Sequence, residues 1–166
     1  MGETTRIARK EMRALLQSRL WNLSLALVLL SAFAGMYQAY LGHRGQIELY
    51  GRGEGPEPTS LSAFTSGIWI VANASLPLLS IASTFGAIVN EKRSGTMQLL
   101  LSRPTPRGSI VKGKFLGAFT VVAIASLATV LLTTGLTLAL IGPFGQSDSV
   151  RIMAFASVLT LHTSIW

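Results

Sequence analysis

Long stretches without any charged residue are the feature that most constrains this chain. No Asp, Glu, Lys or Arg occurs in residues 20–43, 58–90, 115–147 or 152–166. A helix needs about 20 consecutive apolar residues to cross the hydrocarbon core of a bilayer, and each of the first three stretches is longer than that. The sequence therefore predicts a membrane protein, and it argues against a soluble globular domain and against a disordered tail.

The composition excludes several kinds of chemistry. Only 13% of the residues are charged, whereas roughly a quarter is usual in soluble proteins. The chain contains no cysteine, which excludes disulfides, thiolate metal sites and cysteine nucleophiles. Two histidines, His43 and His162, and one aspartate, Asp148, are too few and too scattered to form a metal site. We therefore expect the chain itself to bind neither a metal nor a cofactor.

The basic residues indicate which way the chain crosses the membrane. Most of them precede the first uncharged stretch or lie between the second and the third, whereas the other two connections together hold only three basic residues beside four acidic ones. Since Lys and Arg are retained on the cytoplasmic side, we expect the N-terminus and the loop between spans 2 and 3 to lie inside. The basic residues assigned to the inside are Arg6, Arg9, Lys10, Arg13, Arg19, Lys92, Arg93, Arg103, Arg107, Lys112 and Lys114.

These signals predict an all-α polytopic bundle that forms a single transmembrane domain over residues 1–166. The expected segments are an interfacial helix (6–20), span 1 (20–41), an outer loop (42–65), span 2 (66–90), a cytoplasmic coupling loop (91–108), span 3 (109–141), an outer loop (142–151) and the start of span 4 (152–166). The last stretch is too short to cross the bilayer, so we expect span 4 to be truncated. Glycines and prolines predict irregular structure over 42–60, and Pro77 predicts a kink in span 2.

Residues 6–20 have the pattern of an amphipathic helix, with apolar side chains on one arc of a helical wheel and basic ones on the opposite arc. The basic arc contains Arg6, Lys10 and Arg13, and the apolar arc contains Ala8, Met12, Leu15, Leu16 and Leu20. One interpretation is an interfacial helix that lies on the inner leaflet and leads into span 1. The other is an ordinary basic flank that only sets the orientation of the chain.

Asn73 is a polar residue in the middle of span 2. Its amide must find a hydrogen-bonding partner where water is absent. Asn73 either lines a path for a transported substrate or makes a contact between helices on a face of small residues. The sequence leaves both interpretations open.

Patterns typical of catalysis and of ion coupling are missing from the sequence. Residues 108–114 match a phosphate-binding P-loop up to its last position, where Phe115 replaces the Ser or Thr that holds magnesium. No acidic residue lies in the middle of a span, although proton- and sodium-coupled carriers commonly have one there. We therefore expect a chain without its own catalytic site that is not a secondary transporter.

The loop between spans 2 and 3 is the most informative part of the sequence. Thr96 can cap a short helix that carries Leu99, Leu100 and Leu101, and Pro104 can end it. The expected product is a short cytoplasmic elbow with an apolar patch and basic flanks. Such a patch is either buried against the membrane or offered to a soluble partner.

This loop resembles the one between the second and third spans of ABC-type 2 transporter permeases, the membrane subunits of ATP-driven exporters. The resemblance is carried by a Glu after the second span, a Gly-Thr pair, a run of leucines, Ser-x-Pro, an Arg three residues beyond that Pro, and a Gly-Lys before the third span. The basic N-terminal segment is similar to that of the same family. The matching loop positions here are Glu91, Gly95, Thr96, Leu99, Leu100, Leu101, Ser102, Pro104, Arg107, Gly113 and Lys114.

The resemblance implies a division of labour between subunits. A separate ATP-binding subunit would bind ATP and magnesium and hydrolyse the nucleotide, and this chain would pair with a second permease copy to form a path through the cell membrane. The coupling loop would dock on the ATPase, and its candidate residues are Glu91, Gly95, Thr96, Leu99, Leu100, Arg103, Pro104, Arg107 and Lys114. Membrane lipids are further expected partners, and nucleic acid is not. The alternative is a polytopic anchoring or assembly protein that transports nothing.

Overall fold

The computed structural model describes residues 3–94 and 107–165, and its regular elements are all helices. They are α1 (Glu3–Leu16), α2 (Arg19–Gly51), α3 (Ser60–Ile70), the π-helix η1 (Val71–Ser75), α4 (Leu76–Ser94), α6 (Arg107–Leu140) and α7 (Asp148–Ile165). The structure confirms the predicted all-α architecture. Three stretches within these helices are long and apolar enough to cross a membrane: Arg19–Gly51, Ser60–Phe85 and Val111–Leu140.

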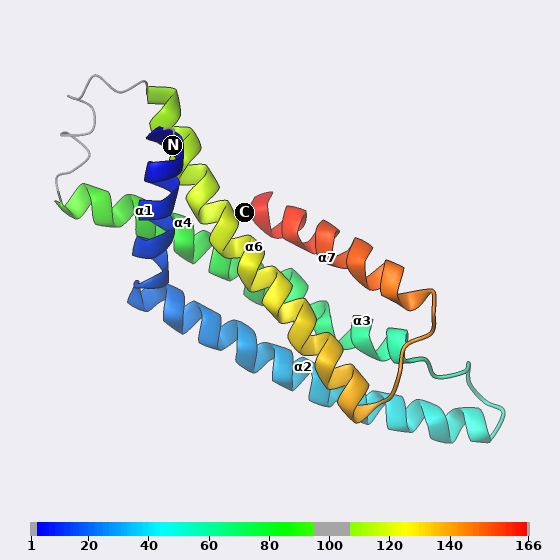
Figure 1. The fold of residues 1–166 in the computed structure, drawn as a ribbon. Helices are drawn as coiled ribbons and strands as arrows, with labels where there is room; N and C mark the ends of the chain where they lie inside the picture. Colours follow the sequence, from blue (N-terminus) through cyan, green and yellow to red (C-terminus); the bar gives the residue numbers. More distant parts are fainter. Residues whose placement is uncertain (1–2, 95–106, 166) are drawn as a thin grey trace.

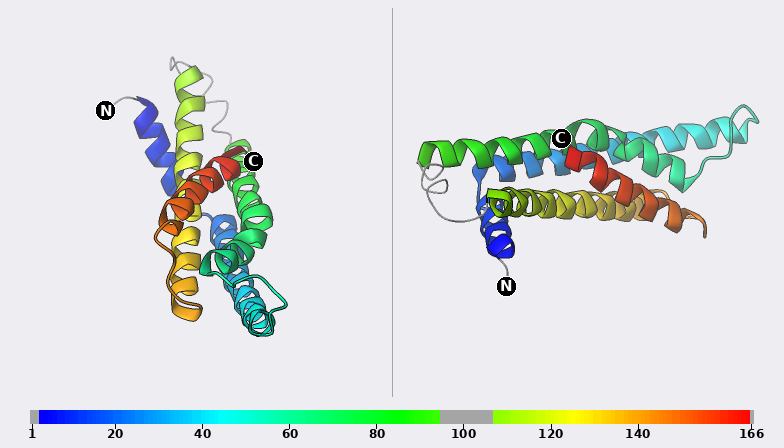
Figure 2. Two further views of the ribbon diagram at one scale, coloured as in Figure 1. Left: turned by 90° about the vertical axis from the view of Figure 1, so that its right-hand side faces the viewer. Right: turned by 90° about the horizontal axis from the view of Figure 1, so that it is seen from above.

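The helices form an elongated bundle in which the chain passes back and forth (Figures 1 and 2). Helix α2 runs to one end of the bundle, α3, η1 and α4 return as one nearly continuous rod, and α6 runs back beside both. Helix α7 packs on α6 and ends about half way along the bundle, and α1 lies across one end (Figure 2).

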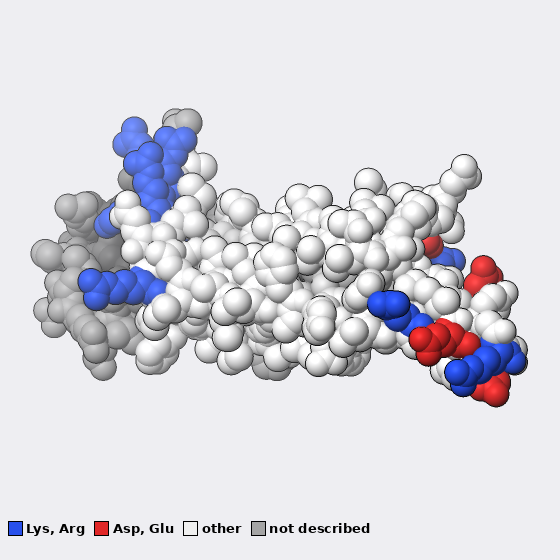
Figure 3. All heavy atoms as spheres, turned by 90° about the horizontal axis from the view of Figure 1, so that it is seen from below, with Lys and Arg blue, Asp and Glu red and all other residues white. Residues whose placement is uncertain are grey.

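Charged residues are confined to the two ends of the bundle, as seen on the face drawn in Figure 3. We call the end that holds α1, the end of α4 and the start of α6 the basic end; its described charged side chains are mainly Lys and Arg. The opposite end, where α2 finishes and α3 and α7 begin, carries both signs, and we call it the mixed-charge end. This separation leaves an uncharged middle, which matches a bundle that crosses a bilayer.

Helix α2 is longer than the sequence suggested. It continues through Gly42 and Gly45 to Gly51, so the expected irregular structure begins only at residue 52. A glycine inside a helix costs only about 1 kcal/mol relative to alanine, which an established helix tolerates. The helix ends where Gly53 adopts a φ of +74°, a conformation that glycine reaches without strain.

Capping residues set where two of the helices begin. Ser18 separates α1 from α2 and accepts a hydrogen bond from the backbone N–H of Trp21 at 3.1 Å. Thr59 caps α3 in the same way through the N–H of Ser62 at 3.2 Å. The sequence predicted that the first helix ends at residue 20 and that the second span begins at residue 66. In the structure α1 ends at Leu16, and the rod of α3, η1 and α4 begins at Ser60.

A π turn precedes Pro77 in the second rod, at the place where the sequence predicted a kink. Residues Val71–Ser75 form η1, and the N–H of Leu76 bonds the carbonyl of Val71, five residues earlier. Proline has no N–H, and its ring crowds the carbonyl four residues before it, which here belongs to Asn73. The wider π turn makes room for the ring without a break in the rod.

Apolar side chains lie both inside the bundle and on its surface. Phe64 and Val28 are fully buried, and Phe64 packs edge to face against Phe144 and Phe155 with ring centroids 6.1 and 5.8 Å away. Leu131 and Met153, in contrast, are more than two-thirds exposed. Large exposed apolar side chains along the middle of the helices are what a lipid-facing surface requires.

Candidate functional site

The basic end brings together the elements on either side of the predicted coupling loop. Helix α4 ends at Ser94 and α6 begins at Arg107, and α1 lies against the first turns of α6 (Figure 1). Helix α6 has 34 residues, which at about 1.5 Å per residue exceed by far the about 30 Å of the hydrocarbon core. The excess length, together with Lys112 and Lys114 in the first turns, indicates that the start of α6 reaches beyond the hydrocarbon, and α1 packs on these first turns.

Two glycines let α1 approach α6 closely. A Cβ atom on Gly113 would lie 2.8 Å from the Cβ of Ile7, and one on Gly117 would lie 2.9 Å from the backbone oxygen of Ala8. Real side chains do not come so close, so only glycine fits at both positions without a shift of α1. Because the two glycines are one helical turn apart, they form a single contact surface for α1.

An ion pair joins the same two helices. The Nζ of Lys114 lies 4.0 Å from Oε1 of Glu11, with the two side chains 27% and 14% exposed. The pair is partly sheltered from water, so salt screens it less than a fully exposed pair. Lys114, which the sequence assigned to the coupling loop, thus contacts α1.

The outer face of α1 is cationic. Arg6, Arg9, Lys10 and Arg13 are exposed, and together with Ala14 and Gln17 they border an open groove of about 410 Å³. Figure 3 shows this concentration of basic side chains at one end of the molecule. The structure thus forms the amphipathic helix predicted from residues 6–20, over Glu3–Leu16, with its opposite face packed on α6.

Most of the predicted coupling residues lie outside the described residues. These are Gly95, Thr96, Leu99, Leu100, Arg103 and Pro104. Glu91 lies in the last turns of α4 and Arg107 is the first residue of α6, so both belong to the basic end by their place in the backbone. Their role in coupling stays a prediction.

Asn73 lies on the outside of the described chain. It is exposed, and its Nδ2 donates a hydrogen bond to the backbone oxygen of Trp69 at 2.9 Å. The amide of Asn73 is therefore partly satisfied within its own helix, next to the π turn. A path that involved Asn73 would have to run along the outer surface of this helix.

A row of buried hydroxyls along α6 was not singled out from the sequence. Ser126, Thr129, Thr133 and Thr137 are at most 1% exposed, and each donates to the carbonyl four residues earlier. Ser126 also lies 3.2 Å from the hydroxyl of Thr163 on α7. The spacing of three and four residues places these hydroxyls on one face of the helix. This spacing is visible in the sequence and could have predicted the row.

The fold and the basic end together define a class of protein. It is a multi-pass helical membrane protein with a cationic helix, α1, packed against the first turns of its third spanning helix, α6. A family model described as ABC-2 family transporter protein matches residues 5–165. The chain therefore belongs to the ABC-2 transporter family, as the resemblance in the loop implied.

Two curated relatives carry the same description, probable ABC transporter permease protein NosY. The relative from Stutzerimonas stutzeri is 30% identical over 175 aligned positions, which cover 96% of this chain and 60% of the relative. The relative from Pseudomonas aeruginosa is 32% identical over 121 positions, which cover 73% of this chain and 40% of the relative. The chain thus spans about half the length of these relatives and is similar to permeases.

Proposed function

We propose that this chain is the membrane-spanning permease subunit of an ATP-driven exporter and receives conformational changes from a separate ATPase at its basic end. The observation that supports this most is the family match over residues 5–165, together with a basic end formed by the helices on either side of the stretch between Ser94 and Arg107. The relatives with permease names support the same reading. In this proposal the basic end is cytoplasmic, because Lys and Arg are retained there.

Transmission of force from the loop into the spans requires a stiff connection. The loop leads directly into α6, and α1 is packed on the first turns of α6 through Gly113, Gly117 and the Glu11–Lys114 pair. A movement of the loop would therefore carry α6 and α1 together. We propose that ATP and magnesium bind to the partner ATPase and that a second permease copy completes the transport path.

The proposal is tested by co-purification of an ATPase with the tagged protein of natural length in mild detergent. Arg107→Glu places an acidic charge at the start of α6 and should reduce the amount of co-purified ATPase at least tenfold. The matched control is Arg52→Glu, an exposed arginine at the mixed-charge end, which should leave the amount unchanged. Size-exclusion profiles check that both variants remain folded.

Two outcomes contradict the proposal. If no protein with a complete P-loop co-purifies with the parent in any of several mild detergents, the coupled-transport function fails. If the ATPase is retained by Arg107→Glu and also by Leu100→Glu, the loop is not its docking site.

A further inference from the structure

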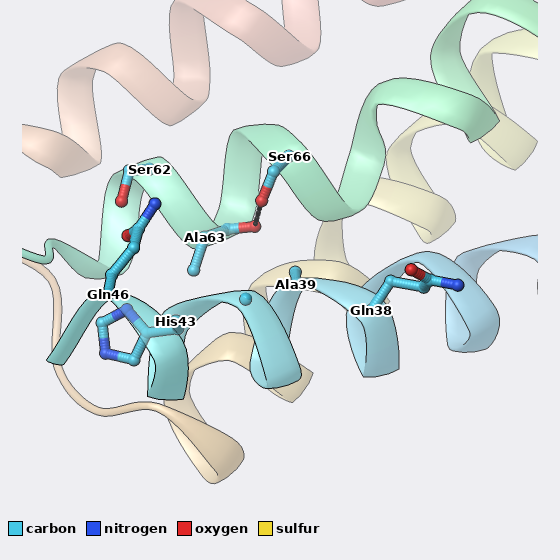
Figure 4. A pocket seen from close by; sticks show the side chains of 8 residues that line it. Gln38, Ala39, His43, Gln46, Ser62, Ala63 and Ser66 are labelled. Atoms are coloured by element: carbon cyan, nitrogen blue, oxygen red, sulfur yellow. Dashed lines mark hydrogen bonds between the residues drawn. The ribbon is translucent and has the colours of Figure 1, made fainter. Parts of the chain in front are cut away.

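A groove with a mainly apolar wall lies between α2 and α3 at the mixed-charge end, far from the basic end, and polar side chains from both helices line part of it. It has a volume of about 260 Å³, and Figure 4 shows the side chains around it. Small residues on both helices leave the space between them open. The lining residues are Gln38, Ala39, Gly42, His43, Gln46, Ser62, Ala63 and Ser66.

The side chains of this groove hold unused hydrogen-bonding capacity. Nδ1 of His43 is buried and has no partner among the described residues. Gln38 and Gln46 are exposed, and Gln46 extends toward Ser62 on the facing helix (Figure 4). The amides of Gln38 and Gln46 are therefore available to a hydrogen-bonding ligand in the groove.

The two serines offer acceptors to the groove. Ser66 donates its hydroxyl hydrogen to the carbonyl of Ala63 at 2.9 Å, and Ser62 donates to the carbonyl of Thr59 at 2.7 Å. With their donors used, both oxygens keep lone pairs for an incoming donor. The groove therefore combines acceptors from serine with donors and acceptors from the amides.

No charged side chain lines the groove. The nearest cation along the chain, Arg44, has its guanidinium 5.9 Å from the ring centre of Tyr40. Placing a charged ligand group between the helices without a counter-charge would be costly. A hydroxyl group donates and accepts at the same oxygen and carries no charge, so it fits this set of partners.

The position of the groove along α2 indicates where such a group would come from. The uncharged stretch of the sequence ends at His43, and Tyr37 and Tyr40 precede it. Tyrosines gather at the boundary between hydrocarbon and headgroups. The groove thus lies at the level of the headgroups.

We propose that this groove binds an uncharged, hydroxyl-bearing group such as the sugar or glycerol moiety of a lipid headgroup. The binding requires no ATPase, so this proposal is tested independently of the proposed transport function. Two sources share this chemistry, a lipid-borne sugar and a free sugar, and the experiment separates them.

The test uses the whole protein in phosphatidylcholine nanodiscs that contain a photoreactive monoglucosyl lipid, with labelled peptides located by mass spectrometry. Labelling is expected on residues 38–46 and 62–66. Gly42→Leu should reduce it at least tenfold, because a side chain at Gly42 meets no neighbouring atom within 4 Å and would occupy the groove. The matched control is Gly45→Leu, which has the same free space but does not line the groove, and should label like the parent.

A second pair of variants tests hydrogen bonding rather than access. Gln46→Leu should reduce labelling about fivefold, the effect of losing a hydrogen bond of roughly 1 kcal/mol. Gln146→Leu, an exposed glutamine at the same end, should have no effect. Unlabelled glucosyl lipid that competes where free methyl glucoside does not assigns the site to a lipid, and competition by both assigns it to the sugar itself.

The proposal is overturned if these segments are not labelled in the parent protein. It is also overturned if Gly42→Leu is labelled as strongly as the parent. Equal labelling by a photoreactive phosphatidic acid overturns the preference for an uncharged group.

Discussion

At the scale of single residues, glycines decide how closely helices lie. Gly113 and Gly117 admit α1, and Gly35 and Gly67 do the same between α2 and α3, where a Cβ on Gly35 would collide with the carbonyl of Gly67. In a membrane, apolar burial does not drive helices together, so close packing of this kind is a main source of cohesion.

Replacing Gly117 by alanine should therefore loosen α1. The new Cβ would press on the Cβ of Glu11 and the backbone oxygen of Ala8, and overpacking of this kind costs about 1–3 kcal/mol. We expect a lower Tm in detergent and faster hydrogen exchange over residues 3–16. Gly135→Ala, where a Cβ meets nothing within 4 Å, is the control and should keep or raise the parent's Tm, because alanine is the better helix former. Unchanged exchange over α1 in Gly117→Ala would show that the contact contributes little.

At the scale of elements, α1 is an amphipathic helix whose two faces have different surroundings. One face packs on α6, and the other presents Arg6, Arg9, Lys10 and Arg13 to the outside. Because α1 lies across the end of the bundle (Figure 2), these cations lie side by side where lipid headgroups are expected.

Charge reversal on this face should weaken the binding of anionic lipid. Each basic residue near an anionic surface contributes about 1 kcal/mol, so Lys10→Glu combined with Arg13→Glu should lower the enrichment of phosphatidylglycerol around the protein at least about fivefold. The enrichment is measured as lipid retained per protein after purification from mixed-lipid nanodiscs. Arg52→Glu serves as the control at the opposite end. Equal retention in the double variant would argue that α1 only sets orientation.

At the scale of the whole molecule, the separation of charge predicts a single orientation in the membrane. The chain has no cysteine, so single-cysteine variants report accessibility without background. In intact cells, Ser147→Cys at the mixed-charge end should react with an impermeant maleimide, whereas Gln17→Cys at the basic end should react only after permeabilisation. The reverse pattern would place the basic end outside and contradict the cytoplasmic coupling loop.

The pattern of charged and uncharged residues was sufficient to predict the all-α class, three helices long and apolar enough to span a membrane, and the amphipathic N-terminal helix. Each of these depends on one-dimensional patterns, such as the uncharged stretch 115–147 that became most of α6. The continuation of α2 to Gly51 was not predictable in the same way. Glycine propensity suggested irregular structure there, and an already formed helix overrode it.

The sequence by itself determined that this protein is of the multi-pass membrane class, because three uncharged stretches are each long enough to cross the hydrocarbon core as a helix. It also determined which end is basic. Only the tertiary structure decided that α1 lies on Gly113 and Gly117, that Asn73 faces outward, and that Gln46 and Ser62 line the same groove from facing helices. These facts depend on which faces of separate helices meet, and that follows from three-dimensional packing that no local pattern encodes.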